Sequence, residues 1–174
     1  MPSARPTLLN SSARAATASE LKFRIQARGT WQRAARVIAI DDVAAGLLNR
    51  IAPKGEQASR FLVFDRVADA VSADATRDVI LRRLDGDGEV ALSDELHDAD
   101  FIFMVATGGS GALAAAVIGE ACWRRSVTTG AVVIGQPIRS AEAVAAIRPH
   151  ARVLLVTEEQ DDVLALLTAL RVMQ

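Results

Sequence analysis

Five short runs of apolar residues are spaced along the chain, and more polar segments with helix signals lie between them. A run of four or five apolar residues bounded by charged or turn-forming residues predicts a strand that is buried on both faces. Such strands alternating with helices predict a parallel sheet covered by helices on both sides, with right-handed crossovers. The runs are residues 36–40, 61–64, 101–105, 131–134 and 153–156.

Capping residues place the expected helices between these runs. Asp42 and Ser140 stand where each can cap a helix, and Thr157 and Gln160 have the spacing of a capping box. We therefore expect an α/β fold of the three-layer, doubly wound, Rossmann-like kind, with a mostly parallel sheet of about five to six strands. The expected helices are 43–52, 73–84, from Ser110 or Gly111 to about 125, 140–147 and 158–171, and residues 85–88 form a turn.

The chain length is typical of one domain, with 174 residues of which 51% are hydrophobic, enough to cover both faces of a buried sheet. We expect residues 34–174 to form this single α/β domain. The first twenty residues have the character of a disordered leader, and a helical spacing of apolar residues follows until Gly29 interrupts it. We expect residues 1–33 to be a flexible or helical N-terminal arm, which a homo-oligomer could use against a neighbouring subunit.

The charge balance limits the classes of partner. The chain has 20 basic and 21 acidic residues, a formal net charge of -1, so it lacks the basic character of a nucleic-acid-binding domain. Its longest strongly apolar stretch, residues 112–118, is far shorter than the ~20 residues that cross a bilayer. We therefore expect no nucleic acid and no membrane as partners. The missing secretory signal and the lone Cys122 indicate a cytoplasmic protein, with that thiol buried in a helix rather than reactive.

The best candidate site is the glycine turn between the third apolar run and the helix after it. Glycines allow a ligand to approach the backbone closely, and a helix N-terminus offers free N–H groups and a positive dipole end to a phosphate. The alternative is a tight strand-to-helix connection that binds nothing. The candidate phosphate-binding residues are Thr107, Gly108, Gly109, Ser110 and Gly111.

Acidic residues follow the first two predicted strands. Asp65, which follows the second, has the position of a ribose contact, and the alternative is a solvated acid at a strand end. Asp41 and Asp42 follow the first strand, where they can cap the next helix and would repel a phosphate.

The order of these segments resembles the nucleotide-binding domain of the FtsZ/tubulin family. The resemblance is carried mainly by residues 98–111, DADFIFMVATGGSG, which are similar to that family's strand and glycine-rich signature, and it implies GTP or GDP bound at Gly108–Gly111. The chain departs from the family where Asp41 and Asp42 replace the first glycine-rich loop. It also ends soon after the last helix, so we expect neither polymerisation nor efficient GTP hydrolysis. Supporting segments are 36–40, 48–51, 61–65, 112–122 and 131–137.

Three functions are compatible with the sequence. The first is a domain that binds a guanine nucleotide or a phosphate ligand at the turn. The second is a degenerate, non-enzymatic domain that works through protein contacts, as a homo-oligomer for example. The third is a Rossmann-type dinucleotide- or flavin-binding enzyme, which needs an acid–base residue near the strand ends. His97 and His150 both precede strands, so we assign no catalytic residue and no metal site.

Overall fold

The computed structural model describes residues 34–52, 59–68, 78–86, 88–108, 111–170 and 172. The chain divides into two units, Met1–Trp31 and Gln32–Gln174, and all of the described residues belong to the second. The expected N-terminal arm, residues 1–33, lies outside the described residues. The strands are β1 (Ala35–Ala39), β2 (Arg60–Val67), β3 (Val79–Arg83), β4 (Glu89–Ala91), β5 (Phe101–Ala106), β6 (Thr128–Ile134) and β7 (Val153–Thr157). The helices are α2 (Asp42–Ile51), α3 (Leu92–Glu95), α4 (Ala112–Arg124), α5 (Pro137–Ile147) and α6 (Gln160–Ala169).

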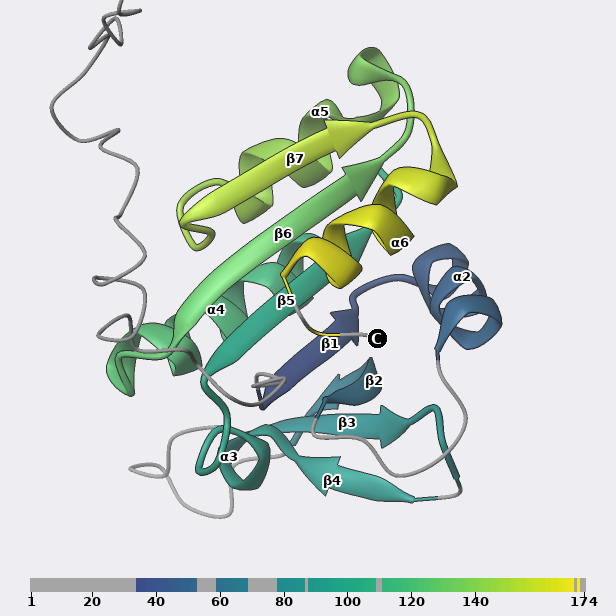
Figure 1. Ribbon diagram of the computed structural model, residues 1–174. Coiled ribbons are helices and arrows are strands. Elements are labelled where there is room, and N and C mark those ends of the chain that lie inside the picture. Colours follow the sequence, from purple (N-terminus) through teal and green to yellow (C-terminus); the bar gives the residue numbers. More distant parts are fainter. Residues whose placement is uncertain are drawn as a thin grey trace, which may run out of the picture. The chain divides into compact units, whose positions relative to one another are not determined.

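The strands form one seven-stranded sheet in the order β4-β3-β2-β1-β5-β6-β7, which Figure 1 shows from β4 at the bottom to β7 at the top. The five strands from β2 to β7 in this order are parallel, whereas β3 and β4 are antiparallel to their neighbours. This confirms the α/β fold and the mostly parallel sheet. All five strands expected from apolar runs are present in it.

The two additional strands correct the prediction of five to six strands and of a helix at 73–84. Residues 79–83 are β3, which pairs with β2, while residues 73–77 lie outside the described residues. Val79 and Leu81 are buried and alternate along the strand with less buried residues, so the period is two rather than helical. The N–H of Arg83 donates to the Gly88 carbonyl at 3.1 Å, and β4 pairs with β3 as an antiparallel partner. Residue 87 of the expected turn at 85–88 lies outside the described residues.

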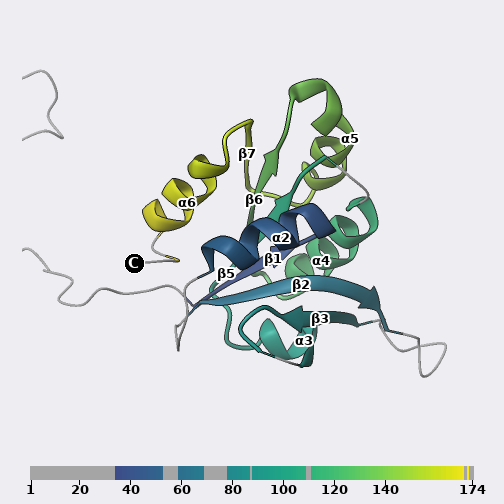
Figure 2. The same ribbon diagram turned by 90° about the vertical axis from the view of Figure 1, so that its right-hand side faces the viewer.

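Two hydrophobic clusters lie on the two faces of the sheet. Successive residues of β1 pack into different clusters: Ile38 belongs to one cluster and Val37 to the other. Helices α4 and α5 pack on the first cluster through residues such as Ile118 and Ile147. Helices α2 and α6 pack on the second, and Figure 2 shows α6 on the opposite side of the sheet from α4 and α5. None of the helices in the described ranges has both the length and the apolar character needed to cross a bilayer.

Three helix starts differ from the prediction. The N-cap of α2 is Asp41 rather than Asp42, and α5 begins at Pro137, before Ser140. The capping box expected for α6 does not form, because Glu159 is the N-cap and the Gln160 side chain instead accepts a hydrogen bond from Arg50 Nη2 at 3.1 Å. Local spacing indicated a cap at each position, but Pro137, whose fixed φ suits the first position of a helix, starts α5 earlier, and Gln160 is engaged by a residue 110 positions away.

A buried ion-pair cluster stabilises the end of the sheet at which strand β1 begins. Glu95 of α3, only 2% exposed, accepts hydrogen bonds from Arg36 Nε at 2.5 Å and from Arg60 Nη1 at 2.7 Å. Arg83 Nη2 lies 3.6 Å from the same carboxylate. Because buried charges are costly without partners, Glu95 is the group that allows Arg36 to lie inside the sheet.

Candidate functional site

The strand order places the best-positioned site between β1 and β5. After β1 the chain enters α2 on one face of the sheet, and after β5 it enters α4 on the other face. The two helices leave in opposite directions, so the carboxyl ends of β1 and β5 form the switch point where open α/β sheets bind ligands. Thr107, the first residue of the predicted turn, and Asp41 therefore meet at one place in the fold.

The side chain of Asp41 connects the ends of these two strands. Its Oδ2 accepts a hydrogen bond from the backbone N–H of Thr107 at 2.7 Å, and its Oδ1 accepts one from the Thr107 hydroxyl, also at 2.7 Å. Oδ1 also accepts the N–H of Ala44 at 2.8 Å, which caps α2. One partly buried carboxylate thus receives three donors from two segments 66 residues apart.

One of these hydrogen bonds uses a donor that the sequence assigned to a phosphate, the hydroxyl of Thr107. In the phosphate hypothesis the Thr107 hydroxyl and the free N–H groups of the following helix bind the ligand, whereas here the hydroxyl and the N–H of Thr107 are both donated to Asp41. A phosphate placed about 4 Å from that carboxylate would be repelled by roughly 4 kcal/mol for each negative charge at an effective dielectric constant near 20. The carboxylate of Asp41 therefore accepts the Thr107 hydroxyl that the phosphate hypothesis gave to an anionic ligand.

Close packing accounts for the described glycines of the turn. Gly108 has a φ of +83°, and a Cβ added to it would lie 2.9 Å from the carbonyl oxygen of Arg139 in α5. A Cβ on Gly111 would lie 2.8 Å from Cδ1 of Ile40. Gly108 therefore requires glycine whether or not a ligand binds, and a side chain at Gly111 would require the Ile40 side chain to shift. Gly109 and Ser110, the other predicted phosphate contacts, lie outside the described residues.

Asp65 lies within β2 rather than at its end. The strand continues to Val67, and the pairing register with β3 shifts between Phe64 and Arg66, around Asp65. The carboxylate of Asp65 forms an ion pair with Arg66, which also donates two hydrogen bonds of 2.8 Å to Glu89 and holds the pKa of that carboxyl below its usual value. In the sheet, β1 separates Asp65 from the turn. A ribose contact by Asp65 stays a prediction.

The remaining candidate groups lie away from the switch point. Cys122 is fully buried in α4, as expected, and burial raises the pKa of its thiol to about 12. His97 is exposed, and His150 packs so closely against Gly119 that a Cβ added there would overlap the imidazole ring. Among the described residues, no group of three His, Cys, Asp or Glu side chains could hold a metal ion.

Two surface hollows are lined by described residues, and neither is lined by Asp41 or Thr107. The larger, about 640 Å³, lies between the C-terminal part of α4 with the start of β6 and the segment that connects α5 to β7, and its lining includes Trp123 and Arg152. The second lies beside α2 and the hairpin of β3 and β4. Sequence reasoning predicted Asp41 as half of a capping pair but missed its contact with Thr107, because no local pattern signals a hydrogen bond across 66 residues.

No protein-family model matches this chain, and no curated protein matches it.

Proposed function

We propose that this chain is a non-enzymatic domain that acts through protein contacts as a homo-oligomer. In this proposal its sheet and helices are a three-layer, doubly wound, Rossmann-like fold related to the nucleotide-binding domain of FtsZ and tubulin. The observation that carries the proposal is the carboxylate of Asp41, bonded to both donors of Thr107. An internal carboxylate in the ligand's position is what a nucleotide-binding fold would have after losing its nucleotide.

The energetics favour the internal carboxylate over an added ligand. Hydrogen bonds to a charged acceptor contribute about 1.5–3 kcal/mol each, and the cap of α2 adds about 1 kcal/mol. A nucleotide would have to break these bonds and overcome the repulsion between its phosphates and Asp41. The contact between the turn and α5, where Gly108 meets Arg139, leaves no room for even a Cβ.

A thermal-shift panel tests this proposal. GTP, GDP, ATP, NAD, FAD and inorganic phosphate are each added, with and without magnesium, to the full chain. A ligand at 100 times its dissociation constant would stabilise the fold by about 2.7 kcal/mol, which is readily measured as a change in Tm. We expect no specific shift with any of them. A shift confined to GTP and GDP would refute the proposal, and a shift with NAD or FAD would favour the Rossmann-type enzyme.

One observation favours guanine-nucleotide or phosphate binding as a second candidate. The N-cap of α4 is Gly111, no side chain caps this helix, and its first turn contains no acidic residue. No negative side chain in the first turn therefore offsets the positive end of the helix dipole. If the panel detects guanine nucleotides, Gly109→Asp should abolish the shift and retain the Tm of the free protein, because the added carboxylate would face the phosphates.

A further inference from the structure

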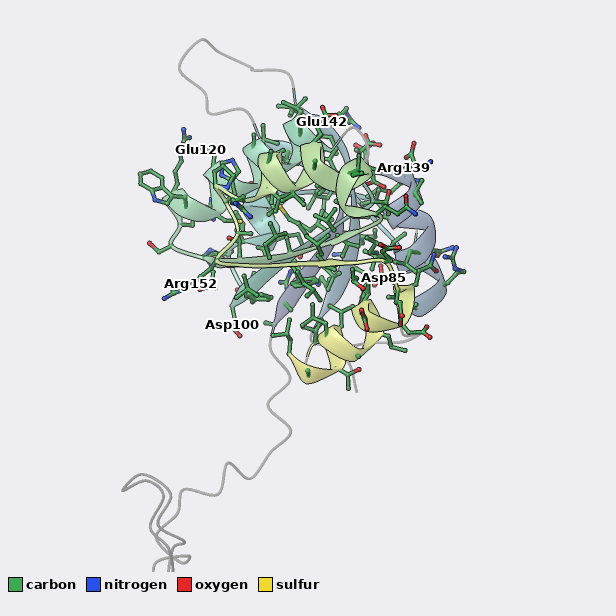
Figure 3. The ribbon with its side chains drawn as sticks, turned by 90° about the horizontal axis from the view of Figure 1, so that it is seen from above. Asp85, Asp100, Glu120, Arg139, Glu142 and Arg152 are labelled. Atoms are coloured by element: carbon green, nitrogen blue, oxygen red, sulfur yellow. The ribbon has the colours of Figure 1, made fainter. Side chains whose placement is uncertain are left out.

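Strand β7 is an edge strand that is exposed and apolar. It is the last strand of the sheet, and Val153, Leu155 and Val156 are 61%, 37% and 39% exposed. Figure 3 looks onto this edge, with α5 along one side of β7 and α6 along the other. An unprotected edge of this kind can pair with a strand from another chain.

The opposite edge of the sheet is protected by features that β7 lacks. Strand β4 has three residues and begins with Glu89, whose carboxylate is held by Arg66. Short length and charge are the usual means by which proteins block edge-to-edge pairing. The five residues of β7, by contrast, are Val-Leu-Leu-Val-Thr without a charge. Of the two edges, β7 is therefore the one suited to pairing.

Symmetry restricts how two copies of β7 can pair. A two-fold axis perpendicular to the sheet makes the strands antiparallel, and residues opposite each other then lie on the same face. Because successive side chains alternate between the two faces, two opposed residues must both have even numbers or both have odd numbers. Gly135 N–H donates to the Thr157 carbonyl at 2.8 Å, so by alternation Leu154 and Val156 direct their backbone groups to the open edge. A pairing centred on Leu155 places Leu154 of one copy opposite Val156 of the other.

The charges beside β7 select this register. Pairing centred on Leu155 brings Arg152, just before β7 of one copy, to the same end of the pair as Glu158, just after β7 of the other copy, and the two-fold axis generates this charge pair twice. Both side chains are exposed, and neither has an ion-pair partner among the described residues. Figure 3 shows Arg152 extending away from the domain at the start of β7. A pairing centred on Leu154 would instead place Arg152 opposite Val156.

We infer that two copies of this chain join through their β7 strands into one continuous sheet, with Leu155 at the two-fold axis and Arg152 of each copy paired with Glu158 of the other. This inference rests on the proposed function and identifies its partner as a second copy. The backbone N–H of Arg152 points inward to the Thr129 carbonyl, so this residue contributes its side chain alone.

Light scattering on the full chain tests the inference. The wild type should have twice the 18.5 kDa mass of one chain. Leu155→Lys places two like charges at the axis and should yield a monomer with an unchanged far-UV circular dichroism spectrum. Leu164→Lys on α6, where the side chain is also exposed, is the matched control and should remain a dimer. A monomeric wild type, or a dimeric Leu155→Lys, would overturn the inference.

A charge exchange tests the register. Arg152→Glu alone and Glu158→Arg alone should each weaken dimerisation by about tenfold, since two opposed pairs become repulsive. The double variant should restore the wild-type dissociation constant, and failure to restore it would overturn the register. The nucleotide panel is independent of these results. A dimer that Leu155→Lys dissociates but that binds GTP would refute the proposed function alone. An oligomer that binds no nucleotide and keeps its mass in Leu155→Lys would refute this inference alone, and a monomeric wild type would overturn both.

Discussion

The carboxylate of Asp41 should contribute a large share of the stability of this domain. Replacement by alanine removes the cap of α2 and both hydrogen bonds from Thr107. The lost cap costs about 1 kcal/mol, and the two bonds to a charged acceptor cost about 1.5 kcal/mol each at the low end of their range. Water can reach the partly buried site and recovers some of this free energy. We expect Asp41→Ala to lower the free energy of unfolding by about 3 kcal/mol.

Urea denaturation of the full chain, followed by circular dichroism at 25 °C, measures this loss. The midpoint should fall while the slope with urea stays the same, since the surface exposed on unfolding does not change. Asp42→Ala is the matched control. Asp42 is the next residue in the chain and is exposed at the start of α2, so its replacement should change the free energy of unfolding by less than about 0.5 kcal/mol. A loss below about 1 kcal/mol for Asp41→Ala would refute the reasoning.

Three further predictions concern other parts of the domain. Gly108→Ala should destabilise it by about 2 kcal/mol or more in the same urea assay, because φ is +83° and the Cβ would meet a backbone oxygen; an unchanged midpoint would contradict the packing. Glu95→Gln should cost about 3 kcal/mol by leaving Arg36 buried without a counter-charge, and a loss under about 1 kcal/mol would show that water reaches the cluster. Cys122, whose thiol stays neutral at pH 8 because burial raises its pKa to about 12, should react with a thiol reagent only as the protein unfolds. Immediate reaction of the folded protein would show that the thiol is accessible.

The apolar runs predicted the strands well because burial on both faces leaves a local signal. Residues 101–105 are apolar throughout, and β5 is completely buried. Strand β3 was missed for the opposite reason. Arg82 and Arg83 interrupt its apolar pattern, and its strand conformation depends on pairing with β2. Tertiary pairing of this kind overrides local propensity.

The sequence singled out both segments of the candidate site, but it did not indicate the contact between them. The glycine turn and the acids at 41–42 were both identified as candidate features. The topology brings them to the carboxyl ends of the neighbouring strands β1 and β5. The hydrogen bonds from Thr107 to Asp41 depend on β1 and β5 being neighbours, and strand order is not encoded in local sequence. The exposed edge at β7 could not be predicted for the same reason, because its apolar run has the same appearance as those of the buried strands.

The central claim is that the Asp41 carboxylate occupies the position of an anionic ligand, and anion rescue tests it most directly. The free energy of unfolding of the wild type and of Asp41→Ala is measured in inorganic phosphate and in chloride at equal ionic strength. Removing the carboxylate frees the donors of Thr107, so phosphate at ten times its dissociation constant should stabilise Asp41→Ala by about 1.4 kcal/mol more than it stabilises the wild type. An equal response of the two proteins to phosphate would contradict the claim.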